Sequence, residues 1–245
     1  MAKTILVTGA SSGIGRAIAI ACAAKGETVV LTGRNIARLE ETLRQCNEVS
    51  NWHSAEHIIL SADLTDKAER EVLAARVPML DGVVHCAGIG SRVLGKMLEE
   101  GDVRQVMNVN FEAPVLLQAE LLREKKIAKE ASIVFIASAA ATMPSVGNAI
   151  YSASKAAMIA YAKCLALELA PRKIRVNCIS PAMVWTDLAL VGATEEQLRE
   201  AEQAYPMKRY GQPEDIAPMA VYLLSDDAAW VTGSNFELTG GAQTL

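Results

Sequence analysis

The sequence predicts a single-domain α/β fold over residues 1–245, a doubly wound parallel sheet of about seven strands with helices on both faces. Short apolar runs alternate with helical stretches along the whole chain, which is the pattern of consecutive βα units. The 245 residues are 51% hydrophobic, as expected where a sheet is buried on both faces. The first apolar run ends in a glycine-rich turn that leads into an Ala-rich helix, the usual start of such a fold.

The composition argues against several classes of protein. No apolar run reaches the ~18 residues of a membrane span, and the N-terminus has no signal-peptide pattern. The five cysteines are scattered without a C-x-x-C pair, which indicates reduced thiols and a cytoplasmic location. A net charge of −4 argues against nucleic-acid binding. His53 and His57 have the spacing of a helical metal pair, but they lie in a polar stretch without a third ligand, so we expect no metal.

The first strand, residues 3–8, is followed by a turn at 8–15 and a helix over 16–26. Glycines in such a turn allow backbone amides to approach a pyrophosphate, and the helix N-terminus supplies partial positive charge. The alternative is a tight turn that binds nothing, but three glycines serve this one turn. We therefore expect a Rossmann-like dinucleotide site. Its candidate residues in the turn are Thr8, Gly9, Ser11, Ser12, Gly13, Ile14 and Gly15.

The second strand, residues 27–33, ends in Gly33, Arg34 and Asn35. An acidic residue at this point would bind the ribose 2′-hydroxyl of NAD. Arg34 could instead hold a 2′-phosphate in a forked, charge-assisted contact, although it could also be an ordinary surface arginine. We expect NADP (NADPH) as the cofactor rather than NAD.

A helix over 35–47 and a polar loop lead to the third strand, residues 57–64. This strand ends in Asp63 and Leu64, where the carboxylate could meet the adenine edge. Thr65 or Asp66 could cap the next helix, residues 66–76. The fourth strand, residues 80–88, ends in the small residues Ala87 and Gly88, which let a flat cofactor lie against the backbone.

A long helix is expected over 103–125, with Asn108 and Asn110 in its interior and Pro114 one turn later. Proline removes a helical hydrogen bond and kinks the helix. A carbonyl near Asn110 could thereby be freed to hold a water molecule. The alternative is that one of the two asparagines is simply exposed.

The fifth strand, residues 131–138, ends at Ser138, and a helix over 149–170 begins near Tyr151. Lys155 follows Tyr151 at i+4, so phenol and ammonium share one helical face. A neighbouring cation favours the phenolate, and a phenol tuned in this way can transfer a proton near neutral pH. By itself the spacing is common by chance. Ligands of open α/β sheets bind at the C-terminal strand ends, so Ser138 and Tyr151 are expected to meet there.

The sixth strand, residues 173–180, is followed by Pro181, Ala182 and Thr186. A polar, helix-prone segment at 187–210 is long enough to be a substrate lid. A helix over 212–226 and a strand over 234–241 complete the chain.

Together these residues resemble the classical short-chain dehydrogenase/reductase family over essentially the whole chain. No single motif is decisive, but their order and spacing make chance agreement very improbable. The motifs are TGASSGIG at 8–15, Asp63-Leu64, Ala87-Gly88, Asn110, Ser138, YSASK from Tyr151 to Lys155, Asn177, Pro181 with Thr186, and Gly240-Gly241.

The resemblance implies a role for each site residue. Hydride from the reduced nicotinamide would reach a carbonyl carbon, Tyr151 would protonate the forming alkoxide, and Ser138 would bind the carbonyl oxygen. Lys155 would lower the pKa of Tyr151 and bond the nicotinamide ribose. Asn110 would hold the water that relays protons to Lys155. Thr186 and the backbone near Val184 would orient the carboxamide.

Three positions depart from the pattern of that family. His85-Cys86 stands where Asn-Asn is frequent, and His85 is therefore interpreted as a hydrogen-bonded structural residue. Ala182 replaces a glycine, which would restrict the backbone if φ had to be positive. Thr239 precedes the closing glycines where an acid or asparagine is common. None of these departures removes a catalytic group.

Length, motif spacing and Arg34 resemble in particular the bacterial 3-oxoacyl-acyl-carrier-protein reductases, which implies an acyl-thioester substrate and an acidic carrier-protein partner. A basic surface would bind such a carrier, but lysines and arginines are common near helix C-termini in any protein. Basic residues therefore argue only modestly for a carrier-protein partner. The alternatives are a dehydrogenase of a sugar, polyol or other small alcohol, and a catalytically idle scaffold. Family resemblance also implies a homotetramer built on the helices at 103–125 and 149–170. Candidate docking cations are Lys125, Lys126, Lys129, Arg172 and Lys173, and the apolar lid residues are Trp185, Leu188, Leu190, Val191 and Met207.

Overall fold

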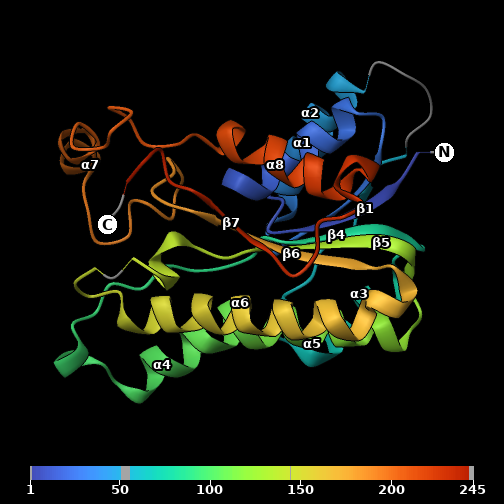
Figure 1. Cartoon of the computed structure of the whole chain (residues 1–245), viewed down its shortest axis with the longest axis horizontal. Coiled ribbons are helices and arrows are strands. Elements are labelled where there is room, and N and C mark those ends of the chain that lie inside the picture. The colour runs from blue at the N-terminus through green and yellow to red at the C-terminus, as the bar shows by residue number, and fades with distance from the viewer. Residues whose placement is uncertain (1, 51–55, 144, 243–245) are drawn as a thin grey trace.

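The computed structural model describes residues 2–50, 56–143 and 145–242. Within them, seven parallel strands form one sheet in the order β3-β2-β1-β4-β5-β6-β7 (Figure 1). The predicted α/β fold with a doubly wound parallel sheet is therefore confirmed. The strands are β1 (Thr4–Thr8), β2 (Thr28–Thr32), β3 (Ile58–Ile59), β4 (Leu80–His85), β5 (Ile127–Ile136), β6 (Arg175–Pro181) and β7 (Asn235–Leu238).

Helices cover both faces of this sheet (Figure 1). One face carries α1 (Gly13–Ala24), α2 (Ile36–Val49) and α8 (Pro213–Leu224). The other carries α3 (Lys67–Arg76), α4 (Glu100–Met107), α5 (Ala113–Arg123) and α6 (Ala149–Leu169), and α7 (Glu195–Glu202) lies apart from both layers. No described helix is both long and apolar enough to cross a membrane.

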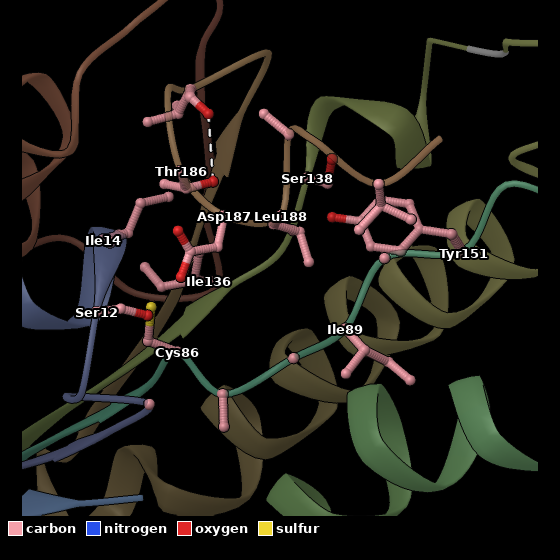
Figure 2. Close-up of a pocket in the computed structure, with 18 of the residues that line it drawn as sticks. Ser12, Ile14, Cys86, Ile89, Ile136, Ser138, Tyr151, Thr186, Asp187 and Leu188 are labelled. Atoms are coloured by element: carbon pink, nitrogen blue, oxygen red, sulfur yellow. Dashed lines mark hydrogen bonds between the residues drawn. The ribbon is translucent and has the colours of Figure 1, made fainter. Parts of the chain in front are cut away.

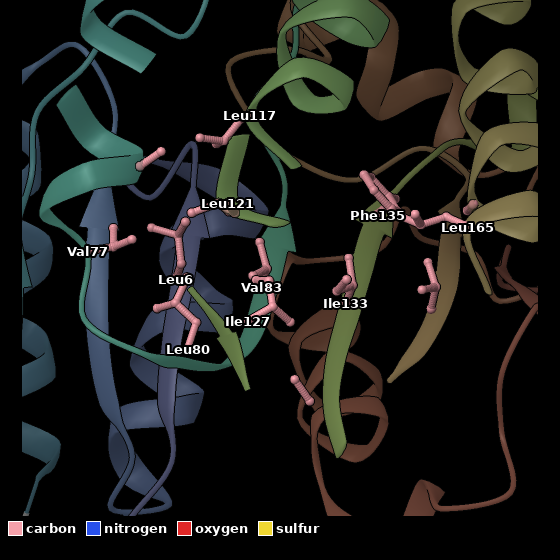
Figure 3. Close-up of a cluster of buried hydrophobic side chains, with 14 of the residues drawn as sticks. Leu6, Val77, Leu80, Val83, Leu117, Leu121, Ile127, Ile133, Phe135 and Leu165 are labelled. Atoms are coloured by element: carbon pink, nitrogen blue, oxygen red, sulfur yellow. The ribbon is translucent and has the colours of Figure 1, made fainter. Parts of the chain in front are cut away.

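The strands from β1 to β6 send side chains into two aliphatic cores, one under each helical layer, because successive side chains of a pleated strand point to opposite faces. In β5, Ile133 and Phe135 pack toward α5 and α6, whereas Val134 and Ile136 face the layer of α1 and α8. Figure 3 shows the first of these cores, where Leu117 and Leu121 of α5 meet the strand residues. Burying a side chain of this size stabilises the fold by about 1.5–3 kcal/mol.

The predicted helix over 103–125 is interrupted, as Pro114 suggested. It begins three residues earlier, at Glu100 in α4, passes through a π-helical turn at Asn108–Glu112, and ends at Arg123 in α5. Pro114 has no N–H to donate to the carbonyl four residues before it, that of Asn110, and a wider turn accommodates the lost bond.

The largest differences from the predicted strand boundaries are in β5 and β3. β5 begins at Ile127 rather than at residue 131, and it therefore includes Lys129. Its first residues pair with β4 through Leu80 and Ile127, followed by an irregularity in register. β3 retains only two residues, although the N–H groups of Leu60 and Ala62 still donate to the carbonyls of Leu31 and Gly33 beside it.

The strand order reverses between β1 and β4, since the chain builds outward from β1 to β3 and then returns to β4 on the other side. Loops leaving the C-terminal ends of β1 and β4 consequently go to opposite faces. This leaves a crevice at the switch point, where open α/β sheets bind ligands.

Candidate active site

A cavity of ≈ 1040 Å³ opens at this switch point. Figure 2 shows its wall, with Ser12 and Ile14 on one side and Ser138 and Tyr151 on the other. Of the site residues predicted from sequence, all but Thr8 and Asn110 line the cavity. Those that line it are Gly9, Ser11, Ser12, Gly13, Ile14, Gly15, Arg34, Asp63, Leu64, Ala87, Gly88, Ser138, Tyr151, Lys155, Pro181, Val184 and Thr186.

The turn after β1 has no room for side chains at two of its glycines. Gly9 has φ +65°, and a Cβ there would lie 2.9 Å from the backbone of Ala87. A Cβ on Gly15 would lie 2.3 Å from the carbonyl oxygen of Gly9. The glycines thus create the shallow cradle, backed by the N-terminus of α1, that a pyrophosphate requires.

Replacing Gly15 by Ala is expected to lower the melting temperature and to weaken dinucleotide binding at least tenfold, because the added Cβ must displace the backbone of Gly9. Binding is measured by calorimetry and stability by thermal unfolding. Gly101→Ala is the matched control: Gly101 lies in α4 with no neighbour within 4 Å of a built Cβ. That change should keep binding unchanged and stabilise the protein by about 0.5–1 kcal/mol. Equal behaviour of the two variants would contradict the cradle.

Thr8 lies behind this turn rather than in the cavity. It is fully buried, and its Oγ1 accepts hydrogen bonds from the backbone N–H groups of Cys86 and Ala87, at 2.9 and 3.1 Å. Thr8 therefore holds the ends of β1 and β4 together and sets the position of the cavity floor.

The end of the cavity at β2 and β3 is charged. Arg34 Nη1 lies 3.9 Å from Asp63 Oδ2, and the Arg34 side chain is 72% exposed. Burial alone would raise the pKa of Asp63, but hydrogen bonds from Thr65 and the charge of Arg34 lower it overall. Asp66 rather than Thr65 caps α3, accepting from the Glu69 N–H at 2.9 Å. The loosely held Arg34 is free to turn toward an anion.

A second ion pair crosses the cavity mouth. Arg38 Nη1, in the first turn of α2, lies 2.9 Å from Asp187 Oδ2, the first residue of the predicted lid segment. The segment 187–210 contains α7, and the Trp185 indole beside it donates to Glu202 at 2.9 Å. Leu188 and Val191 of this segment line the cavity and remain 40% and 43% exposed.

Asn110 lies in the π-helical turn and is only 1% exposed. Its Oδ1 accepts from the Ile89 N–H at 2.8 Å, while its Nδ2 donates to the Ile89 carbonyl at 3.0 Å and to Ser154 Oγ at 3.2 Å. The side chain therefore ties the loop after β4 to α6. A Cβ on Gly88 would lie 3.2 Å from Asn110 Oδ1 and 3.5 Å from Lys155 Nζ, so Gly88 must stay small for Asn110 and Lys155 to keep their places.

Ser138 and Tyr151 meet at the inner end of the cavity (Figure 2). Ser138 is the last residue before a 3-10 turn, and its Oγ accepts from the Ala140 N–H at 3.1 Å. Burial raises the pKa of Tyr151, and the hydrogen bond with Ser138 acts in the opposite direction. The phenol is thus protonated at neutral pH, which is the form that a proton donor needs.

Lys155 lies one turn beyond Tyr151 on the same face, with its Nζ 5.9 Å from the centroid of the Tyr151 ring. Its Nζ donates to the Ile136 carbonyl at 2.9 Å. Burial lowers the pKa of Lys155 to about 8, so the ammonium is mostly charged at pH 7. In this arrangement desolvation of the phenol is the largest influence and raises the pKa of Tyr151 overall, so a lowering of that pKa by Lys155 stays a prediction.

The departures at His85 and Ala182 have simple structural explanations. His85 is buried, stacks on Phe135 at 4.6 Å, and shares a 3.0 Å hydrogen bond with Gln118. Ala182 is not among the described non-glycine residues with positive φ, and its N–H donates to the Leu238 carbonyl at 3.0 Å. His85 is therefore structural, as predicted, and Ala182 introduces no backbone strain.

Other residues singled out in the sequence are also structural. The Asn177 side chain donates to the Val231 carbonyl and accepts from the Ser234 N–H, which fixes the loop before β7. His57 accepts from the Val29 N–H at 3.1 Å, and His53 lies outside the described residues. The described residues hold no group of three His, Cys, Asp or Glu side chains placed to bind a metal ion.

The sequence analysis missed several lining residues, above all Cys86 and Arg92. Both belong to the segment after β4, where the small residues Ala87 and Gly88 drew attention instead. A cavity-lining role for Cys86 could have been suspected from its place directly before Ala87. No signal in the sequence places Arg92.

Comparison with known proteins agrees with the site. A family profile described as "Enoyl-(Acyl carrier protein) reductase" matches residues 9–243, which covers the glycine turn, Ser138, Tyr151 and Lys155. The chain belongs to the short-chain dehydrogenase/reductase family. It is consequently an NAD(P)-dependent oxidoreductase that acts on CH–OH or C=O groups.

Relatives with several different substrates match almost the whole chain. The 3-oxoacyl-acyl-carrier-protein reductase FabG of Rickettsia felis is 34% identical over 98% of this chain and 96% of its own. L-xylulose reductase of Caenorhabditis elegans is 30% identical over 98% and 95%. Among solved structures, a variant of actinorhodin polyketide ketoreductase with NADPH has a TM-score of 0.90 at 30% identity, covering 98% of this chain and 97% of that one.

Proposed function

We propose that this protein is an NADPH-dependent carbonyl reductase, with a 3-oxoacyl thioester as its substrate. The observation that carries the proposal is the meeting of Ser138, Tyr151 and Lys155 at the inner end of a cavity that begins at a glycine-rich cradle. The cavity volume, the glycine cradle and the exposed Arg34 fit a phosphorylated dinucleotide. Such a cofactor supplies the hydride.

The side chains of the site would handle the proton and the developing charge. Ser138 would donate a hydrogen bond to the carbonyl oxygen of the substrate and stabilise its growing negative charge. Tyr151, protonated at neutral pH, would give its proton to that oxygen. Lys155 would hold ribose hydroxyls, and its positive charge would stabilise the phenolate that remains on Tyr151. Asn110 would act as a positioning residue for Lys155 and, through its backbone carbonyl, would hold the relay water.

NADPH preference is proposed to depend on Arg34. Replacing Arg34 by Asp should change the ratio of kcat/KM for NADPH over NADH by about a hundredfold in favour of NADH, because the new carboxylate repels a 2′-phosphate and can accept from a 2′-hydroxyl. Steady-state kinetics with both cofactors measure the ratio. Arg44→Asp, on the exposed side of α2, is the control for charge alone. An unchanged ratio in Arg34→Asp would refute the role of Arg34.

The acyl-thioester substrate is supported by the matched FabG relatives and by the apolar lid residues Leu188 and Val191 at the cavity. NADPH oxidation assayed with an acetoacetyl thioester and with a panel of sugars and polyols tests it. Thioester reduction supports the proposal, and turnover of polyols alone supports the second candidate, a small-alcohol dehydrogenase, which the L-xylulose reductase match favours. Dinucleotide binding without any turnover would make the protein a scaffold.

The candidate docking cations gather at the N-terminal ends of β5 and β6, the sheet edge opposite the cavity. Lys126 donates to the carbonyls of Ala75 and Val77, Arg172 to that of Ile127, and Lys173 pairs with Glu130 at 3.1 Å. Only Lys125 and Lys129 have no such contact among the described residues. These cations are therefore poor support for a carrier-protein surface serving the same subunit.

A cytoplasmic homotetramer is part of the proposal. The outer face of α6 exposes Ala153, Ala156, Ala160 and Leu167, and α5 exposes Leu116. Small side chains along a helix permit close approach of a second helix, and exposed leucines favour burial. Light scattering on the purified protein measures its mass, and a monomer would refute the assembly.

A further inference from the structure

The substrate end of the cavity contains one cation that the mechanism does not use. Six charged side chains among the residues that the structure describes line the cavity, namely Arg34, Arg38, Asp63, Arg92, Lys155 and Asp187. Arg34 lies near Asp63, Arg38 pairs with Asp187, and Lys155 is bonded to Ile136. Among the described residues no carboxylate lies within 4 Å of the Arg92 guanidinium.

The stem of Arg92 is held between the two loops that border the substrate. A Cβ on Gly147, in the loop before α6, would lie 3.3 Å from Arg92 Cγ. A Cβ on Gly192, in the lid segment, would lie 3.2 Å from Arg92 Cδ. Both glycines have positive φ, +83° and +77°, and the Val93 N–H donates to the Gly147 carbonyl at 2.9 Å. Each loop thus lacks a side chain where the Arg92 stem lies.

The charge of Arg92 reaches into the substrate end. Burial and the nearby Glu202 carboxylate raise the pKa of Tyr210, and the positive charge of Arg92 acts against that rise. The other lining residues on this side are neutral, among them Ser145, Asn148, Gln197 and Tyr205. A neutral substrate would leave this cation without an ionic partner, whereas an anionic one would form a charge-assisted hydrogen bond with it.

We propose that Arg92 is a specificity-determining residue that binds an anionic group, a phosphate or a carboxylate, at the end of the substrate remote from the reacting carbonyl. The inference rests on the proposed function, since it assumes that the ketone enters beside Tyr151. An anion-binding Arg92 would favour, as substrates, thioesters carried on a phosphorylated arm and keto acids over neutral sugars and polyols.

Two matched substrate pairs test the proposal and separate the sources of the anion. The first is acetoacetyl-4′-phosphopantetheine against acetoacetyl-pantetheine, and the second is a long-chain keto acid against its methyl ester. In Arg92→Gln the ratio of kcat/KM for the anionic over the neutral member should fall about tenfold in at least one pair, mainly through KM. Arg92→Lys should recover part of the ratio. Arg76→Gln, on an exposed arginine of α3 outside the cavity, should leave it unchanged.

Ionic strength provides a readout that a merely structural role would not change. The anionic preference of the wild type should weaken as salt rises, because screening reduces the attraction at an exposed charge, and Arg92→Gln should lack this dependence. An equal ratio in wild type and Arg92→Gln for both pairs would overturn the proposal. If no ketone is reduced, the proposed function fails instead. Calorimetry of 3-hydroxybutyryl-4′-phosphopantetheine with both proteins then decides the anion site alone.

Discussion

Tyr151→Phe should lower kcat for carbonyl reduction by about 10³-fold while dinucleotide affinity changes no more than a few-fold. The change removes the only atom that would deliver the proton and leaves the ring, which occupies the cavity wall, in place. General acid catalysis by one side chain typically contributes 10²–10⁴-fold. Stopped-flow or steady-state oxidation of NADPH measures kcat, and quenching of protein fluorescence measures cofactor affinity.

Tyr161→Phe is the matched control for Tyr151→Phe. Tyr161 lies on the same helix and packs edge-on against Phe111 and Phe135, at 6.4 and 5.8 Å between ring centroids. Losing its hydroxyl keeps that packing and should leave kcat unchanged. Turnover retained in Tyr151→Phe would contradict its assignment as the proton donor, whatever the behaviour of Tyr161→Phe.

Lys155→Met should abolish turnover to a similar degree and yet stabilise the cofactor-free protein. Burial lowers the pKa of Lys155 from 10.5 to about 8, and that difference corresponds to roughly 3 kcal/mol of destabilisation by the buried charge at pH 7. Met keeps the chain length without the charge, but it loses the hydrogen bond to Ile136, worth about 1 kcal/mol. The net gain in the free energy of unfolding is then about 2 kcal/mol, measured by urea denaturation.

The pH dependence of the free energy of unfolding distinguishes removal of the buried charge from better packing of the methionine side chain. Between pH 8 and 10.5 the unfolded wild type binds more protons at Lys155 than the folded protein, so wild-type stability from this group rises with pH. The advantage of Lys155→Met should therefore shrink across that window. Lys163→Met, at an exposed lysine two turns along α6, should show neither the gain nor the pH dependence. A variant less stable than wild type at pH 7 would disprove the buried-charge cost.

The buried charge of Lys155 would thus serve the proposed reaction and at the same time lower the free energy of unfolding, a frequent combination at active sites. A reductive rate that falls above about pH 8 would report loss of the proton from Lys155 rather than from Tyr151, because burial raises the pKa of Tyr151 above its ordinary value. Spacing alone could not predict this. It places the two side chains on one face, but the water around each is removed only when α6 packs on the sheet.

What the sequence determined by itself was local. Alternating apolar and helical stretches specify consecutive βα units, Pro114 specifies a break in its helix, and Tyr151 and Lys155 must share a face because a helix has 3.6 residues per turn. The need for glycine at position 15 is equally local, since a Cβ there would meet the carbonyl oxygen of Gly9 in the same turn. These properties depend on neighbours a few positions away, and the structure agrees with them.

Only the tertiary structure decided which groups meet across long separations. Thr8 joins β1 to β4 behind the cavity, and the Asn110 side chain forms hydrogen bonds with Ile89 and Ser154. Lys126 and Arg172 bond to the chain itself, and Arg92 reaches the substrate end between two glycines. Each contact depends on how segments from different parts of the chain pack against one another in the fold. That packing is set by the whole core, so no short stretch of sequence encodes it.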